Sequence, residues 1–188
     1  MNWYDKLERK YSRYTIPNLI SIVVAGQIVV YAVELFVNQY IAFDLSLYST
    51  AILHGQIWRL FTYPLTMYNS NILFMFVSLM CYYFLGTAME SIWGTLKFNL
   101  FYLSGVVLMD VYAMIFSCRA DVYYLNMSLF LGYATMFPNA QFLLFFIIPI
   151  RAWIFALFDL VTILIGVAGD PFPYNLMPLV ALANYFLF

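Results

Sequence analysis

Of the 188 residues, 65% are hydrophobic and only 9% are charged, and the net charge is −1 at neutral pH. This balance excludes an ordinary soluble domain, in which about a quarter of the residues are charged, and gives no sign of the basic surface that binds nucleic acid. With a mean hydropathy of +0.87 and roughly 20 residues to each transmembrane helix, the sequence predicts an all-α, polytopic transmembrane helical bundle of about six spans.

Residues 1–16 precede the first apolar run and mix aromatic with basic side chains. The aromatic residues recur at helical spacing while the basic ones fall on other faces, which predicts a cytoplasmic amphipathic helix lying on the membrane surface. A solvated basic leader is the alternative. No alanine-rich cleavage site follows, so we expect the first apolar run to stay in the protein as an anchor.

Residues 17–188 are expected to form one transmembrane domain. The apolar runs predict spans near 18–37, 72–94, 98–116, 123–137, 148–167 and 174–188. The fourth run is shorter and more polar than the others, and the last is short for a span. The segment 38–69 is too polar to cross lipid and too apolar to lie free in water, so we expect a loop half-embedded in the outer leaflet.

Basic residues predict the orientation of this bundle. Of the eight Lys and Arg residues, the side that holds the N-terminus has Lys6, Arg9, Lys10, Arg13, Lys97 and Arg151, and the opposite side has only Arg59 and Arg119. Because basic residues concentrate on the cytoplasmic side, the N-terminus is predicted to be cytoplasmic. We expect the protein in the plasma (inner) membrane of a prokaryote, or in the endoplasmic reticulum membrane if the source is eukaryotic.

Three segments carry a resemblance to a known family. GQIWRLFTYPL (residues 55–65) contains the pair Trp58 and Arg59, LGTAMESIWGTLKFNLFYLSG (85–105) contains three evenly spaced residues, and FPN (137–139) is followed by IPIRAW (148–153). The evenly spaced residues are Gly86, Glu90 and Gly94, and the FPN segment contains Pro138. In this order the segments resemble the rhomboid family of membrane proteins and its relatives, the Derlins.

The residues of these segments also have physical roles of their own. Trp58 and Arg59 can anchor the loop, with the ring in the acyl boundary and the guanidinium among headgroups or backbone carbonyls. Gly86 and Gly94 allow a close helix approach or a turn. Glu90, four residues from each glycine, can cap or hydrogen-bond a neighbouring element.

The resemblance does not extend to the residues that a rhomboid protease needs. Such an enzyme uses a Ser in a Gly-x-Ser-Gly motif on span four and a His on span six, because a Ser hydroxyl needs a base to attack. No Gly-x-Ser-Gly occurs, Tyr123 stands at the Ser position, and His54, in the first loop, is the only His. We therefore expect a non-catalytic rhomboid-like protein, whose partners the resemblance implies to be the lipid bilayer and transmembrane client proteins.

Two catalytic alternatives stay open at this stage. Family membership would make the chain an intramembrane serine protease, and Ser128 with His54 could form an unconventional pair. Ser128 and Gly132 lie four residues apart, as on a helix-packing face, and this role is favoured. Neither Cys81 nor Cys118 has a partner at a recognisable spacing, so we expect no disulfide, no metal and no cofactor.

Two acidic residues lie within apolar runs, where a carboxylate is costly and is therefore a functional candidate. They are Asp110 in the third predicted span and Asp159 in the fifth. If they were functional, a small transporter or channel would be the natural class. The favoured interpretation is that these carboxylates, with Asn126 and Asn184, hydrogen-bond across helices and stabilise the bundle.

Overall fold

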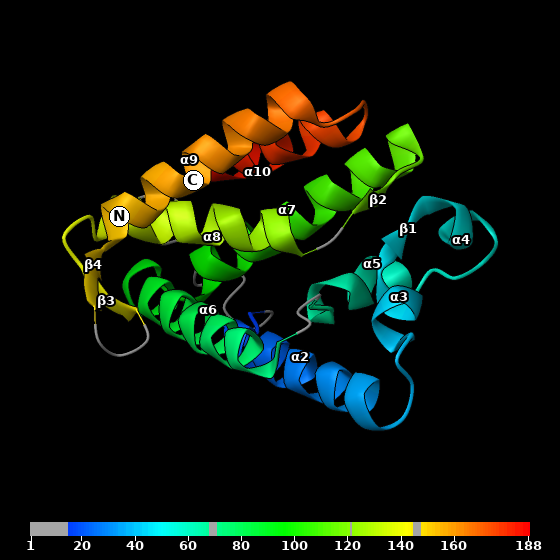
Figure 1. The fold of residues 1–188 in the computed structure, drawn as a ribbon, viewed down its shortest axis with the longest axis horizontal. Helices are drawn as coiled ribbons and strands as arrows, with labels where there is room; N and C mark the ends of the chain where they lie inside the picture. The colour runs from blue at the N-terminus through cyan, green and yellow to red at the C-terminus, as the bar shows by residue number, and fades with distance from the viewer. Residues whose placement is uncertain (1–14, 68–70, 121, 145–147) are drawn as a thin grey trace.

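The computed structural model describes residues 15–67, 71–120, 122–144 and 148–188 (Figure 1). Within these ranges four helices are long and apolar enough to cross a membrane: α2 (Leu19–Phe36), α6 (Ile72–Trp93), α7 (Thr95–Phe116) and α9 (Ala152–Gly169). The chain is therefore mainly helical, and its composition and its long apolar helices are those of a membrane protein. The predicted amphipathic helix at residues 1–16 lies almost wholly outside the described residues.

Two further helices complete the bundle but are shorter. Helix α8 (Tyr123–Met136) has 14 residues and α10 (Met177–Phe186), which follows the short 3₁₀ helix η3 (Tyr174–Leu176), has 10. At 1.5 Å per residue they measure about 21 Å and about 15 Å, against a hydrocarbon core of about 30 Å. The described residues therefore contain four helices of full spanning length, where the sequence predicted about six spans.

Helix α8 lies at the centre of the bundle. It packs against α6, α7, α9 and α10, while α2 packs on the outer side of α6 (Figure 1). Most of its side chains are buried, among them Leu129, Ser128 and Tyr133. A central helix is shielded from lipid on several sides, which explains why α8 tolerates more polar residues than a helix that faces acyl chains.

The first loop is a folded segment that contains α3 (Ile41–Leu45), β1 (Leu47–Tyr48), α4 (Ser49–Leu53), α5 (Arg59–Thr62) and η2 (Tyr63–Leu65). Strand β1 pairs antiparallel with β2 (Arg119–Ala120), just beyond the end of α7. This pairing fixes the loop to one end of the bundle. The loop nevertheless exposes the apolar side chains of Leu53, Ile57, Trp58 and Phe61.

The predicted start of the fifth span is wrong. Residues 148–151 are not helical but form strand β4 (Ile148–Arg151), which pairs antiparallel with β3 (Gln141–Leu144), and α9 begins only at Ala152. Pro149 explains the difference, because proline has no backbone N–H and disfavours a helical conformation in the residue before it. The helix also continues to Gly169, slightly beyond the predicted end.

Candidate functional site

Arg59 holds the first loop together from inside. It is only 5% exposed, and its Nη1 donates to the carbonyl oxygens of Phe43 at 2.8 Å and Ser46 at 2.9 Å. Its Nε donates to Oε1 of Gln56 at 2.7 Å. The sequence allowed the guanidinium to lie among lipid headgroups or among backbone carbonyl groups. In the structure it binds backbone carbonyl groups. Trp58 beside it keeps 51% of its surface exposed.

Two buried residues that the sequence analysis did not single out fasten the loop to the bundle. Gln27 of α2 donates from Nε2 to the carbonyl oxygen of Pro64 at 2.8 Å, and the hydroxyl of Tyr63 donates to the carbonyl oxygen of Val106 in α7 at 3.3 Å. Gln27 is 2% exposed and Tyr63 is fully buried. An amide in the middle of the first apolar run was the signal that could have identified Gln27.

The evenly spaced residues of α6 form its junction with α2 and α7. A Cβ on Gly86 would lie 2.4 Å from Cγ1 of Ile20, so only glycine lets α2 approach this closely. Glu90 Oε1 accepts a hydrogen bond from the backbone N–H of Asn18, before α2, at 3.0 Å. Gly94 links α6 to α7 at φ 79° and ψ 156°, a conformation open essentially to glycine alone. All three residues therefore have structural roles.

A polar network joins α7, α8 and α10 in the interior. Ser104 Oγ donates to Oδ1 of Asn184 at 2.8 Å, and Asn184 Nδ2 donates to Ser128 Oγ at 3.4 Å and to the carbonyl oxygen of Phe101 at 3.3 Å. Gly105 makes room for it, since a Cβ there would lie 2.9 Å from Asn184 Nδ2. The expected cross-helix hydrogen bonding of Asn184 is confirmed. Ser104 was not anticipated.

The structure does not bring Ser128 and His54 together as an active site. Ser128 is fully buried, and its hydroxyl donates to the carbonyl oxygen of Leu125 in its own helix at 2.8 Å. His54 lies exposed at the end of α4, where its Nδ1 bonds the carbonyl oxygen of Thr50 at 2.6 Å. The hydrogen bonds described for Ser128 and His54 therefore do not join the two side chains as a nucleophile and its base.

The two intramembrane carboxylates lie on different helices and in different surroundings. Asp110 is half-buried on α7, and its Oδ1 is buried with no hydrogen-bond partner among the described residues. Asp159 is half-buried on α9, between the inward-facing Ala156 and the buried Ile163. Within the described part of the chain neither carboxylate takes part in a cross-helix hydrogen bond. The two Asp residues were expected to stabilise the bundle through cross-helix hydrogen bonds, and such bonds are not among those of the described residues.

The FPN segment positions the hairpin that precedes α9. The carbonyl oxygen of Pro138 accepts a hydrogen bond from the N–H of Trp153 at 3.4 Å, and that of Ala140 accepts one from Ala152 at 2.8 Å. These bonds connect the end of α8 to the first turn of α9. In the ranges that the structure describes, no three His, Cys, Asp or Glu side chains lie close enough to hold a metal ion.

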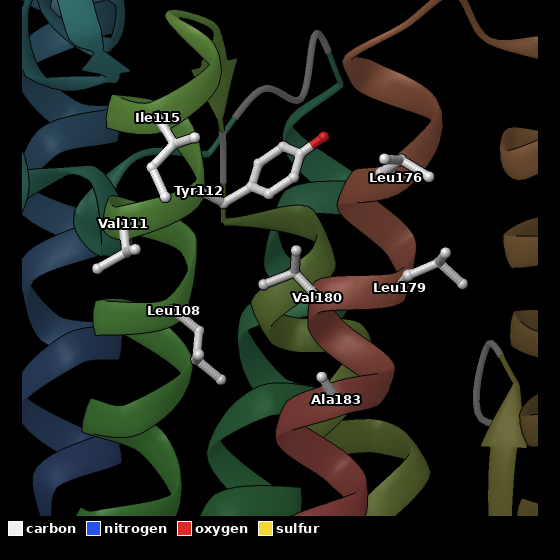
Figure 2. Close-up of a pocket in the computed structure, with 8 residues that line it drawn as sticks. All are labelled: Leu108, Val111, Tyr112, Ile115, Leu176, Leu179, Val180 and Ala183. Carbon is white, nitrogen blue, oxygen red and sulfur yellow. The ribbon is translucent and has the colours of Figure 1, made fainter.

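An apolar groove of about 380 Å³ runs between α7 and α10. Figure 2 shows Tyr112 and Val180 reaching into the space between the two helices. The other lining residues are Leu108, Val111, Ile115, Leu176, Leu179 and Ala183. The only polar group of this lining, the Tyr112 hydroxyl, donates to the carbonyl oxygen of Pro173. An apolar groove on a membrane helix pair suits an acyl chain or an apolar helix better than a polar ligand.

No protein-family model matches this chain, and no curated protein matches it. The resemblance to rhomboids therefore stays a prediction from the residues of the three segments.

Proposed function

We propose that this chain is a non-catalytic, rhomboid-like integral membrane protein that binds transmembrane client proteins. The observation that carries the proposal is the contrast between the two sets of residues that a rhomboid would have. Arg59, Gly86, Glu90 and Gly94 make the contacts that hold the fold together. Ser128, in contrast, is buried, and its described hydrogen bonds run to Leu125 of its own helix and to Asn184 of α10.

The proposal includes a six-span topology with a cytoplasmic N-terminus. Helix α10 supports it, because it packs against α7 and α8 and is tied to both by Asn184. Helix α8 supports it in the same way from the centre of the bundle. Short helices of this kind can cross a membrane where flanking residues or local thinning of the bilayer make up the missing length.

The exposed apolar surfaces provide the area on which a client would bind. The first loop exposes 79% of Phe61 and 70% of Leu53. Helix α9 is the most peripheral of the long helices, with only 11% of its residues buried. In lipid, helices associate through close packing and a few polar contacts. The incompletely covered helix α9 and the apolar groove between α7 and α10 therefore favour reversible binding.

A reconstitution experiment tests the proposal. The protein, labelled with a fluorescence donor, is placed in proteoliposomes with single-span peptides that carry an acceptor, and energy transfer is measured as the peptide fraction rises. We expect saturable transfer that an unlabelled peptide competes away, and peptides that remain intact on a gel. Transfer no greater than that of randomly mixed molecules would contradict the proposal, and so would peptide cleavage that Ser128→Ala abolishes.

A further inference from the structure

A pocket of about 520 Å³ lies at the end of the bundle to which the first loop is fixed by the pairing of β1 with β2. Its polar lining residues come from different elements: Arg119 of β2, Tyr124 of α8, Asp170 directly after α9 and Tyr174 of η3. The pocket opens to the surface, since Tyr174 and Asp170 are exposed. We call it the end pocket.

The end pocket contains one positive and one negative side chain. Arg119 is half-buried, and its guanidinium lies over the ring of Phe43 at 5.1 Å, which helps to hold the charge in place. A guanidinium has several N–H donors, so it can bind a ligand in addition to partners within the protein. The carboxylate of Asp170 forms no ion pair or hydrogen bond with another described residue. The pocket therefore presents a cation and a carboxylate to the same ligand.

The end pocket lies where two helices of spanning length end. Helix α7 ends at Phe116, shortly before Arg119, and α9 ends at Gly169, directly before Asp170. Their 22 and 18 residues measure about 33 Å and about 27 Å, close to the roughly 30 Å of the hydrocarbon core. When these helices cross the bilayer, the pocket therefore lies at the level of the lipid headgroups, where tyrosine side chains also collect.

We propose that the end pocket binds the headgroup of a zwitterionic phospholipid, with its phosphate on Arg119 and its primary ammonium group on Asp170. A guanidinium matches the geometry of phosphate oxygens, and a carboxylate pairs with an ammonium group through charge-assisted hydrogen bonds. A headgroup that carries only a phosphate would leave Asp170 without a partner and bring two negative charges together.

Apolar surface for an acyl chain lies beside the headgroup. Leu176, which lines the apolar groove between α7 and α10, directly precedes Met177, which lines the end pocket. The hydroxyl of Tyr112 in the groove also bonds the carbonyl oxygen of Pro173, in the segment that carries Asp170 and Tyr174. A lipid has both parts that these neighbouring surfaces fit, whereas a soluble zwitterion has only the headgroup.

The test measures lipid binding by native mass spectrometry with two lipids that have identical acyl chains, phosphatidylethanolamine and phosphatidylglycerol. We expect phosphatidylethanolamine to bind roughly tenfold more tightly. Asp170→Asn should remove most of this preference, and Arg119→Gln should weaken the binding of both lipids, since both carry a phosphate. Glu34→Gln is the control. It removes a carboxylate from α2, on the opposite side of the bundle from α9 and α10 (Figure 1), and should leave both affinities unchanged.

Equal binding of the two lipids to the wild type, or a preference that survives Asp170→Asn, would overturn the inference. Soluble phosphoethanolamine separates a lipid site from a site for a small zwitterion, and we expect it to compete only at concentrations far above that of the lipid. Competition at equal concentrations would also overturn the inference. Thermal unfolding in detergent establishes that each variant is folded, and Asp170 can be changed without loss of a described contact because its side chain is exposed.

Discussion

The carboxylate of Glu90, near the end of α6, accepts a hydrogen bond from the backbone N–H of Asn18, which directly precedes α2, at 3.0 Å. Asn18 lies in the left-handed region at φ 54° and makes no side-chain cap of its own. Glu90 therefore supplies from another helix the acceptor that α2 lacks, and its negative charge lies near the positive end of the α2 dipole. The side chain of Asn99 in α7 adds a second bond, to the carbonyl oxygen of Ile16 at 3.1 Å.

Glu90→Ala should lower the free energy of unfolding by about 1 kcal/mol, the usual cost of losing a helix N-cap. Thermal unfolding in detergent should then shift down by about 2–4 °C, as expected for a chain of this size. Glu90→Gln is the matched control, because its side-chain oxygen can still accept the bond from Asn18. If Glu90→Gln destabilises the protein as much as Glu90→Ala, the charge rather than the hydrogen bond is what α2 requires.

Arg59→Ala should be more damaging, with a loss of about 2–3 kcal/mol, because it removes three hydrogen bonds of a buried guanidinium and takes the donor from the buried carbonyl oxygen of Ser46. Arg59→Lys should recover only part of this stability, since an ammonium cannot reproduce the fork of a guanidinium. The measurement is thermal unfolding in detergent together with the yield of purified protein. Unchanged stability of Arg59→Ala would indicate that this side chain serves client binding instead.

Gly94→Ala should lower the free energy of unfolding by about 1–3 kcal/mol, because an alanine must adopt a backbone conformation that only glycine reaches without strain. Gly169→Ala is the control. A Cβ at Gly169, the last residue of α9, meets no atom within 4 Å, and its effect should stay within about 0.5 kcal/mol. Equal melting temperatures for Gly94→Ala and the wild type would show that the α6–α7 junction can adopt another conformation.

The helical class and most helix positions could be predicted from the sequence, because long apolar runs have few alternatives in lipid. The structural roles of Glu90 and Gly94 could also be predicted. A carboxylate at the end of an apolar run is expected to bond a neighbouring element, and a glycine there is expected to form a turn. The start of α9 was misplaced because the apolar run continues through Pro149 and hides the break. Hydropathy does not distinguish a strand from a helix in such a run.

The contacts of the site were less predictable, because they depend on which helices pack together. Gln27 and Ser104 carry no pattern that names their partners, Pro64 and Asn184, which lie far away in the sequence. Such pairs follow from helix packing, and a single sequence gives no measure of it.

The hydrogen bond between Ser104 of α7 and Asn184 of α10 should couple the two side chains energetically. A double-mutant cycle of Ser104→Ala and Asn184→Ala should give a coupling free energy of about 0.6 kcal/mol and at most about 1.7 kcal/mol, the range measured for hydrogen bonds between membrane helices. The small value has a physical cause, since in the unfolded chain within the membrane these groups also find partners. Reversible unfolding in mixed detergent is the measurement.

Thr162 provides the control for this cycle. Its hydroxyl donates to the carbonyl oxygen of Phe158 in its own helix, α9, and it shares no hydrogen-bond partner with Ser104. Ser104→Ala and Thr162→Ala should therefore be additive within about 0.5 kcal/mol. A coupling between Ser104 and Asn184 no larger than this control would mean that their hydrogen bond does not help to hold α10. The helix of 10 residues would then keep its place between α7 and α8 through apolar packing and its other hydrogen bonds, such as the one between Tyr185 and Thr135.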